Sequence, residues 1–228
     1  MGLLLSNSMS YSTYRTLVFD CDGVVLNSNR CKTDAFYQAT LPYGEAAAKA
    51  MVDYHRANGG ISRYTKFAYF LEEIAPRHAA HSAGPDLDGL LENYASEVRQ
   101  ELMRCEVAPG LRALREKTPD ARWLIVSGGD QNELRDVFAD RGLSELFDGG
   151  IFGSPDTKDE ILARELDTQV IRQPALFLGD SKYDHEAASA AGFDFVFLSG
   201  WTEVSGWEEW VASKQITTHE NLAEFGRG

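Results

Sequence analysis

Short β-type runs alternate with helical patterns through most of this 228-residue chain. The runs are Thr16 to Phe19, Trp123 to Val126, Gly150 to Phe152, Ala175 to Leu178 and Phe193 to Leu198. The helical patterns between them include Asn132 to Asp140, Lys158 to Leu166 and Tyr183 to Ala191. Strands that alternate with helices indicate a parallel sheet. The sequence therefore predicts an α/β fold.

One interval breaks this alternation. Residues 20–122 carry little β character, and the interval is much longer than a single crossover helix needs. Its helical segments are Thr33 to Ala39, Glu45 to Asn58, Thr65 to Glu73 and Leu87 to Met103. We expect a helical domain at 29–105, inserted into a core of residues 15–28 and 106–228. Because the insertion begins and ends on the loop side of the first strand, we expect it to lie over that strand's end as a lid.

The composition is that of a globular protein and limits the possible partners. With 22 basic and 35 acidic residues the formal charge is −13, which argues against broad binding to nucleic acid or an anionic membrane. Three cysteines without metal-ligand spacing suit a reducing cytoplasm, and the histidines show no ligand spacing either. Residues 1–14 lack a basic leader and are expected to form a flexible tail. We expect a soluble, cytoplasmic monomer or homodimer, since no apolar run approaches membrane-spanning length.

The first β-type run ends at Asp20-Cys21-Asp22-Gly23, which places two carboxylates where a buried strand becomes a loop. Ligands of α/β sheets bind beyond the carboxyl ends of strands, so Asp20 and Asp22 are candidate site residues. Mg²⁺ prefers oxygen ligands, usually takes one or two carboxylates and would relieve their repulsion. For this tetrapeptide alone, the alternative is a polar turn with Asp as a helix cap.

Three further polar clusters follow later strands. Ser127-Gly128-Gly129-Asp130 offers a hydroxyl and free N–H groups before a helix, as a phosphate cradle or an ordinary turn. Lys158 opens a helix, where the dipole disfavours a cation, so it either has a tertiary purpose or is a solvated surface lysine. Gly179-Asp180-Ser181-Lys182-Tyr183-Asp184 adds Asp180 as a metal ligand. Asp184 is either a second site acid or an N-terminal helix acid.

Together, the four clusters resemble the motifs of the haloacid dehalogenase superfamily, which has an acid pair, a hydroxyl, a lysine and an acid pair in this order. The matching residues are Asp20-Cys21-Asp22-Gly23-Val24-Val25, Ser127, Lys158 and Gly179-Asp180-Ser181-Lys182-Tyr183-Asp184. The resemblance covers nearly the whole chain and is to the subgroup of β-phosphoglucomutase and phosphoglycolate phosphatase. It implies a Rossmannoid, doubly wound parallel-sheet core with an all-α cap inserted after the first motif.

The resemblance also implies the chemistry of the site. Mg²⁺ would be held by Asp20, Asp180 and the backbone carbonyl of Asp22. Asp20 would attack phosphorus and form an aspartyl-phosphate. Asp22 would protonate the leaving group and later deprotonate water. Its presence favours phosphoryl transfer over dehalogenation, because halide leaves without a proton.

The remaining motif residues would serve the phosphoryl group. The resemblance implies that Ser127, Gly128 and Lys158 bind its oxygens and that Lys158 also balances the negative charge. Asp184 would orient Lys158 or a metal-bound water. The expected activity is therefore Mg²⁺-dependent hydrolysis of a small phosphorylated metabolite, such as a sugar phosphate or a phosphoglycolate-like compound.

The inserted domain offers one indication of the substrate. Gly60-Ile61-Ser62-Arg63 resembles a Gly-x-Ser-Arg segment in the caps of β-phosphoglucomutase-like members, where the arginine meets the substrate's non-transferring end. Arg63, with Lys66 about one helical turn later, could bind a second phosphate or a carboxylate. The alternative is a helix N-terminus capped by Ser62 with two solvated cations.

Three other functions are compatible with parts of this pattern. A phosphomutase of the same architecture would return the phosphoryl group to a bound substrate under a water-excluding cap. A catalytically silent binding module is disfavoured, because it need not keep all the charged positions together. Phosphonatase-type enzymes form a Schiff base with a cap lysine, and nothing in the sequence marks Lys32, Lys49 or Lys66 as buried and activated.

Overall fold

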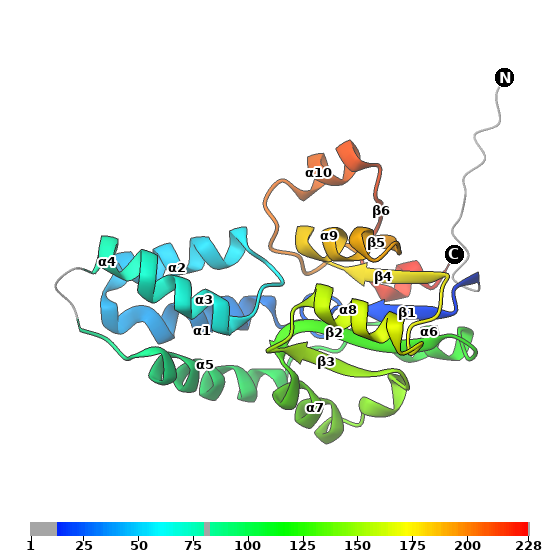
Figure 1. The fold of residues 1–228 in the computed structure, drawn as a ribbon, viewed down its shortest axis with the longest axis horizontal. Coiled ribbons are helices and arrows are strands. Elements are labelled where there is room, and N and C mark those ends of the chain that lie inside the picture. Colours follow the sequence, from blue (N-terminus) through cyan, green and yellow to red (C-terminus); the bar gives the residue numbers. More distant parts are fainter. Residues whose placement is uncertain (1–12, 80–82, 228) are drawn as a thin grey trace.

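The computed structural model describes residues 13–79 and 83–227, whose core is a six-stranded, all-parallel sheet (Figure 1). The strands are β1 (Thr16–Phe19), β2 (Arg122–Asp130), β3 (Gly150–Ser154), β4 (Ala175–Gly179), β5 (Asp194–Leu198) and β6 (Thr217–His219). The predicted α/β fold is confirmed, and all five predicted runs are strands. β6 was not predicted, because it is short, polar and incompletely buried.

The strand order reverses at β1. In the sheet the order is β3-β2-β1-β4-β5-β6, so the chain adds β2 and β3 on one side of β1 and then β4, β5 and β6 on the other. At such a switch point the connections leave in opposite directions and open a crevice at the carboxyl ends of the strands. Asp20 directly follows β1 and Asp180 directly follows β4. The topology thus places these two acids at the crevice.

Alternate strand residues pack on opposite faces of the sheet. Leu17 and Phe19 belong to the apolar core on one face, whereas Val18 belongs to the core on the other face. The first face is covered by α6 (Leu111–Lys117), α7 (Gln131–Asp140) and α11 (Leu222–Phe225), and the second by α8 (Lys158–Asp167), α9 (Lys182–Ala190) and α10 (Trp207–Lys214). Burial on both faces explains why the strands are continuous apolar runs.

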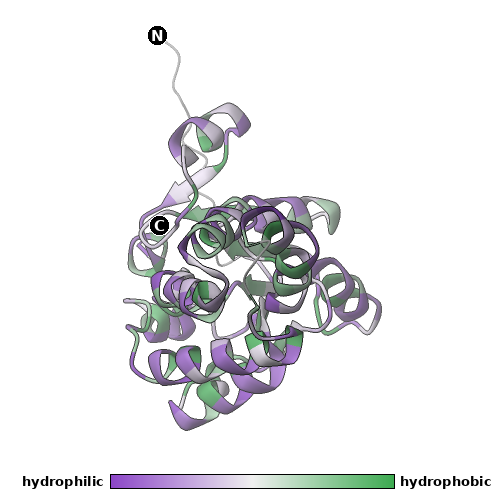
Figure 2. Cartoon of the chain, turned by 90° about the vertical axis from the view of Figure 1, so that its left-hand side faces the viewer, coloured by the Kyte–Doolittle hydropathy of each residue, from purple (hydrophilic) through white to green (hydrophobic). Residues whose placement is uncertain are grey.

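Helices between β1 and β2 form a separate cap beyond the carboxyl ends of the strands (Figure 1). They are α1 (Asn29–Thr40), α2 (Glu45–Ala57), α3 (Arg63–Tyr69), α4 (Ala75–His78) and α5 (Leu87–Leu102), and a π-helical turn at Phe70–Ile74 joins α3 to α4. Figure 2 views this end of the molecule and shows hydrophilic and hydrophobic stretches alternating along its helices. The buried sides meet in a small aromatic core that includes Phe36, Phe67, Phe70 and Tyr94.

Two linkers join the cap to the core, and they pair with each other. The backbone N–H of Asn27 donates to the carbonyl of Glu106 at 2.9 Å, and that of Ala108 donates to the carbonyl of Val25 at 2.9 Å. These bonds bring the entrance and the exit of the cap to one place. The expected domain limits, 29 and 105, fall beside this paired segment, and we retain them as a proposal.

The N-terminal part of the core begins earlier than expected. Tyr14, which the sequence assigns to the tail, is buried, and its hydroxyl donates to Asp194 Oδ2 at 2.8 Å. Residues 1–12 of the expected tail lie outside the described residues. Within the described ranges, no helix combines the length and the apolar character needed to cross a membrane.

Substitution of Phe177 tests whether the sheet is buried on both faces. It lies fully buried in β4, on the face that α9 covers. Phe177→Ala is expected to lower the free energy of unfolding by about 3–5 kcal/mol, because a large cavity remains. Leu41→Ala, at a residue that is 38% exposed, is the control and should change it by less than about 0.5 kcal/mol. Denaturant unfolding followed by tryptophan fluorescence measures both, and equal changes would contradict this packing.

Candidate active site

Asp20 and Lys158 meet at the switch point. Asp20 is 4% exposed, and its Oδ1 accepts a hydrogen bond from the Cys21 backbone N–H at 2.7 Å. The Nζ of Lys158 lies 3.1 Å from the same oxygen. Lys158 is the first residue of α8, whose N-terminus is fixed by a capping box between Thr157 and Glu160. The predicted tertiary purpose of this lysine is therefore to face Asp20 and not solvent.

Asp184 holds Lys158 from the other side. Its Oδ1 contacts the Lys158 ammonium, and both side chains are buried. Its Oδ2 accepts hydrogen bonds from the Ser181 backbone N–H at 3.0 Å and the Ser181 hydroxyl at 2.7 Å, which completes a capping box at the start of α9. Both interpretations of Asp184 therefore apply, because this helix acid also positions the lysine.

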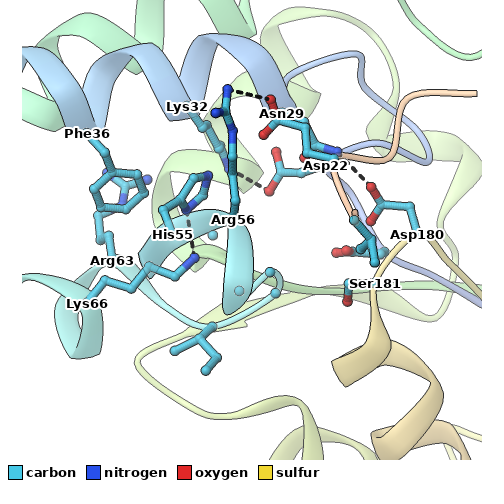
Figure 3. A pocket seen from close by; sticks show the side chains of 18 of the residues that line it. Asp22, Asn29, Lys32, Phe36, His55, Arg56, Arg63, Lys66, Asp180 and Ser181 are labelled. Carbon is cyan, nitrogen blue, oxygen red and sulfur yellow. Dashed lines mark hydrogen bonds and ion pairs between the residues drawn. The ribbon is translucent and has the colours of Figure 1, made fainter. Parts of the chain in front are cut away.

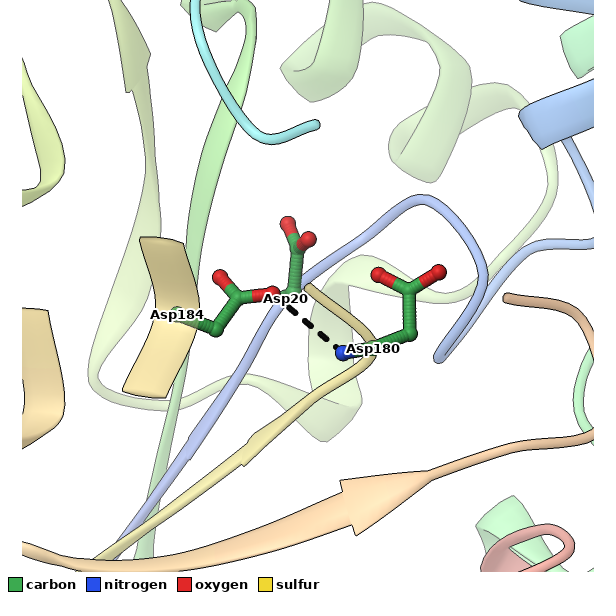
Figure 4. Close-up of side chains that lie close together, drawn as sticks. All are labelled: Asp20, Asp180 and Asp184. Carbon is green, nitrogen blue, oxygen red and sulfur yellow. Dashed lines mark hydrogen bonds between the residues drawn. The ribbon is translucent and has the colours of Figure 1, made fainter. Parts of the chain in front are cut away.

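Three buried carboxylates converge here, from Asp20, Asp180 and Asp184 (Figure 4). Each offers an oxygen within 4.8 Å of the others. Burial, reinforced by Asp184, raises the pKa of Asp20 to about 7, and burial next to Asp20 raises that of Asp180 well above its ordinary value. Lys158 is in contact with two of these acids, Asp20 and Asp184, so the three carboxyl groups share one neighbouring lysine. A set of carboxylate oxygens of this kind fits a hard divalent cation.

The side chain of Asp22 points away from this cluster. Its Oδ1 accepts a hydrogen bond from the Ser28 hydroxyl at 2.5 Å, and its Oδ2 lies 2.6 Å from Nζ of Lys32, on α1 of the cap. Burial opposes ionisation, but the ion pair with Lys32 outweighs it, so the pKa of Asp22 is lowered. The two acids of the first motif therefore have different partners, one in the core and one in the cap.

The glycine turn of the second motif touches the cap. β2 continues past its predicted end to Asp130, with an irregular register after Val126. Ser127 is fully buried, and its Oγ accepts a hydrogen bond from the Gly129 backbone N–H at 3.0 Å. A Cβ at Gly128 would lie 2.2 Å from the carbonyl oxygen of Gly60 in the cap. Only glycine allows this approach of the turn to the cap loop.

Arg63 is bound by the core. Its guanidinium, 6% exposed, contacts Glu133 Oε2 on α7 and lies 4.7 Å from the ring centre of Tyr94. The Ser62 hydroxyl caps α3, as the alternative interpretation predicted. The cations are not solvated, however, because Arg63 and Lys66 are both buried. The arginine expected to meet the substrate already has a carboxylate partner.

A pocket between cap and core brings these groups together (Figure 3). The core lines it with Asp20, Asp22, Gly128, Gly129, Asp180 and Ser181, and the cap adds both Arg63 and Lys66. Ser127 and Lys158 do not line it; Lys158 lies behind Asp20. The polar residues of the pocket that the sequence did not predict as site residues include Asn29, Lys32, His55, Arg56, Tyr94 and Glu203. The only signal for Asn29 and Lys32 is their helical spacing on one face of α1, and Glu203 lies in a loop without such a signal.

The burial of the cap lysines corrects one sequence-based argument. Lys32 and Lys66 are 6% and 2% exposed, although nothing in the sequence marks them as buried. Lys49 is exposed and paired with Glu45. His55, one of the histidines without ligand spacing, lines the pocket. The reason given against a cap-lysine Schiff base therefore does not hold.

The fold and site define a class of protein: an α/β enzyme with a helical cap over an acid cluster at the switch point. A family model described as haloacid dehalogenase-like hydrolase matches residues 14–192. The chain belongs to this family. Among the curated proteins, none matches the sequence.

Solved structures share the fold along nearly the whole chain. A predicted phosphoglycolate phosphatase from Haemophilus somnus 129pt has a TM-score of 0.73 at 16% identity, covering 96% of this chain and 99% of that one. CbbY from Rhodobacter sphaeroides, in complex with phosphate, has a TM-score of 0.68 at 18% identity, with 93% and 96% covered. A phosphonoacetaldehyde hydrolase-like protein from Oleispira antarctica has a TM-score of 0.71 at 13% identity, with 99% and 97% covered.

The Arg63–Glu133 pair gives a test of the contact between cap and core. Glu133→Gln leaves a buried guanidinium without its counter-ion and is expected to lower the free energy of unfolding by about 3 kcal/mol. Glu73→Gln removes the same charge from an exposed pair with Arg77 and should cost less than about 1 kcal/mol. Urea unfolding measures both variants. Equal losses would show that Glu133 is not a buried partner.

Proposed function

We propose that the protein is a Mg²⁺-dependent phosphomonoester phosphatase that works through an aspartyl-phosphate. The observation that carries this proposal is the position of Asp20, buried between Lys158 and the pocket and within reach of Asp180. A carboxylate nucleophile needs such a neighbouring cation, because a phosphate dianion otherwise repels it. Membership in the hydrolase family supports the same reaction class.

The acids at the switch point fit a magnesium ion. Asp20, Asp180 and the backbone carbonyl of Asp22 would hold it, with Asp184 behind them. Gly23 allows the first loop to approach, because a Cβ there would lie 2.1 Å from Asp180 Oδ2. When bound, the ion neutralises charge between the carboxylates and the phosphate.

The chain's own residues have distinct roles in phosphoryl transfer. Asp20 attacks phosphorus as the bond to the leaving oxygen breaks, and water later releases phosphate from Asp20. Lys158, held by Asp184, balances the charge on Asp20 and the phosphoryl oxygens. Ser127 fixes the turn in which Gly128 and Gly129 face the pocket.

Asp22 is the proton carrier in this proposal. It would give a proton to the leaving alkoxide and then accept one from water. Its ion pair with Lys32 favours the carboxylate, which is the form that the second step needs. The pair also aligns Asp22 from the cap side, so closure of the cap contributes to the proton transfer.

The size of the pocket limits the substrate. Its cavity volume is about 70 Å³, well below the roughly 300–1,000 Å³ of typical drug-sized ligand sites. A small phosphorylated metabolite of the size of phosphoglycolate or a small sugar phosphate is consistent with this space.

Replacement of the nucleophile tests the reaction. The wild-type protein with Mg²⁺ is expected to release phosphate from p-nitrophenyl phosphate, and Asp20→Asn should lower kcat by roughly 10³-fold or more. Asp34→Asn, at an exposed residue of the cap, is the control and should leave kcat unchanged. Activity that survives Asp20→Asn would contradict the aspartyl-phosphate. In a panel of phosphomonoesters, isomer formation without phosphate release would indicate a phosphomutase instead.

The raised pKa of Asp20 predicts how metal binding depends on pH. Below its pKa of about 7, Asp20 holds a proton that must leave before a cation binds. The Mg²⁺ dissociation constant is therefore expected to rise by at least roughly tenfold from pH 8 to pH 6, since the pKa of Asp180 is raised as well. Isothermal titration calorimetry measures it, and Asp180→Asn should abolish binding at both values. Binding that is independent of pH would contradict a role for Asp20 as ligand.

Removal of Mg²⁺ by EDTA should abolish phosphate release.

A further inference from the structure

Four basic side chains are buried in and behind the pocket. Three have carboxylate partners: Lys32 pairs with Asp22, Arg63 with Glu133, and Lys158 with Asp20 and Asp184. The fourth is Lys66, which is 2% exposed and forms no ion pair with any carboxylate in the described part of the chain. It is therefore the exception among the buried cations.

Lys66 has no carboxylate in direct contact among the described residues, and Asp22 and Glu203 act on it only from a greater distance. Its Nζ lies 2.8 Å from Nδ1 of His55 and 5.5 Å from the ring centre of Phe36, against which the His55 ring also packs (Figure 3). Burial, together with repulsion from Lys32, lowers the pKa of Lys66 to about 7. Burial and the proximity of Lys66 likewise lower the pKa of His55 well below its ordinary value, so the imidazole is neutral.

The other basic side chains of the pocket already have carboxylate neighbours, so they are less available than Lys66 to bind an anion. Arg63 is occupied by Glu133, and Lys32 is occupied by Asp22. Arg56 lies at the rim, half exposed, with Glu203 at 4.0 Å. A buried ammonium without a counter-ion is unfavourable, and a neutral imidazole supplies only a lone pair. An anionic ligand in the pocket that Lys66 and Asp20 both line would supply this counter-ion and favour the ammonium over the neutral amine.

We propose that Lys66 selects the substrate by pairing with an anionic group, a carboxylate or a second phosphate, on the leaving part of the phosphomonoester. This inference rests on the proposed phosphatase function. Asp20, with Lys158 behind it, takes the phosphoryl group at the core end of the pocket, and Lys66 takes the second anion at the cap end. An uncharged leaving group leaves the ammonium of Lys66 without a partner, so the site discriminates against it.

Three small phosphomonoesters show whether the site prefers an uncharged leaving group, a carboxylate or a second phosphate. Ethyl phosphate has an uncharged two-carbon leaving group, 2-phosphoglycolate adds a carboxylate at the same size, and 1,3-propanediol bisphosphate carries a second phosphate. Steady-state kinetics of phosphate release give kcat and KM for each probe with the wild type, Lys66→Met and Lys49→Met. Lys49 is the matched control, because it is a cap lysine that is exposed and paired with Glu45 at 2.7 Å.

Lys66→Met is expected to lower kcat/KM by at least about tenfold for the anionic probe that the wild type prefers, mainly through KM. Its kcat/KM for ethyl phosphate should stay within about threefold of the wild type, and Lys49→Met should change none of the three. The preferred anionic probe identifies the group as a carboxylate or a phosphate. Equal effects of Lys66→Met on all three probes, or no effect on any, would overturn the assignment.

Two controls distinguish a failure of the Lys66 assignment from a failure of the proposed function and from misfolding of the variant. If the wild type releases phosphate from no phosphomonoester, the proposed function fails; if it does release phosphate but Lys66→Met leaves selectivity unchanged, only the role of Lys66 fails. Thermal unfolding shows whether the variant is folded, and Lys66→Gln replaces it if it is not. Trapping of phosphonoacetaldehyde on Lys66 by borohydride would also overturn the proposal, because it would show a covalent role for the amine.

Discussion

The ammonium of Lys158 is the interaction on which the site depends. Asp20 and Asp184 hold it between them; Asp20 directly follows β1, and Asp184 lies in the first turn of α9, the helix after β4. Buried charges are stable only when they are paired, so the acids at β1 and β4 require a cation, which α8 supplies after β3. The doubly wound topology makes this possible because it collects all these strand ends at one crevice. The topology that forms the sheet therefore also brings the buried acids to the lysine that pairs with them.

The same requirement links the cap to the core. Asp22 is paired with Lys32 of the cap, and Arg63 of the cap is paired with Glu133 of the core. Any opening of the cap separates opposite charges, so the closed pocket and its electrostatics form together. Among the buried basic side chains of the described residues, Lys66 is the one that forms no ion pair with a carboxylate. A ligand that brings an anion would complete the balance and favour closure.

The core and its motif residues could be predicted from the sequence, because local pattern determines them. Strands buried on both faces are continuous apolar runs, and residues such as Asp20 and Asp180 follow such runs directly. The cap side could not be predicted to the same extent. Lys32 and Lys66 look like surface lysines in the sequence, and only the packing of separate helices buries them. Arg63 was expected to be available to substrate, but Glu133, far along the chain, occupies it.

The paired linkers of the cap determine how easily the helical insertion could be exchanged for another. The hydrogen bonds from Asn27 to Glu106 and from Ala108 to Val25 close the insertion at its base. A loop whose ends already meet adds little closure entropy to the rest of the fold, whatever its length. The sheet would therefore tolerate replacement of the helical insertion by one of different size, provided that Asp22 and Glu133 keep cationic partners. The acid cluster of Asp20, Asp180 and Asp184 thus belongs to the core, whereas Lys66 belongs to the insertion and could change without altering the cluster.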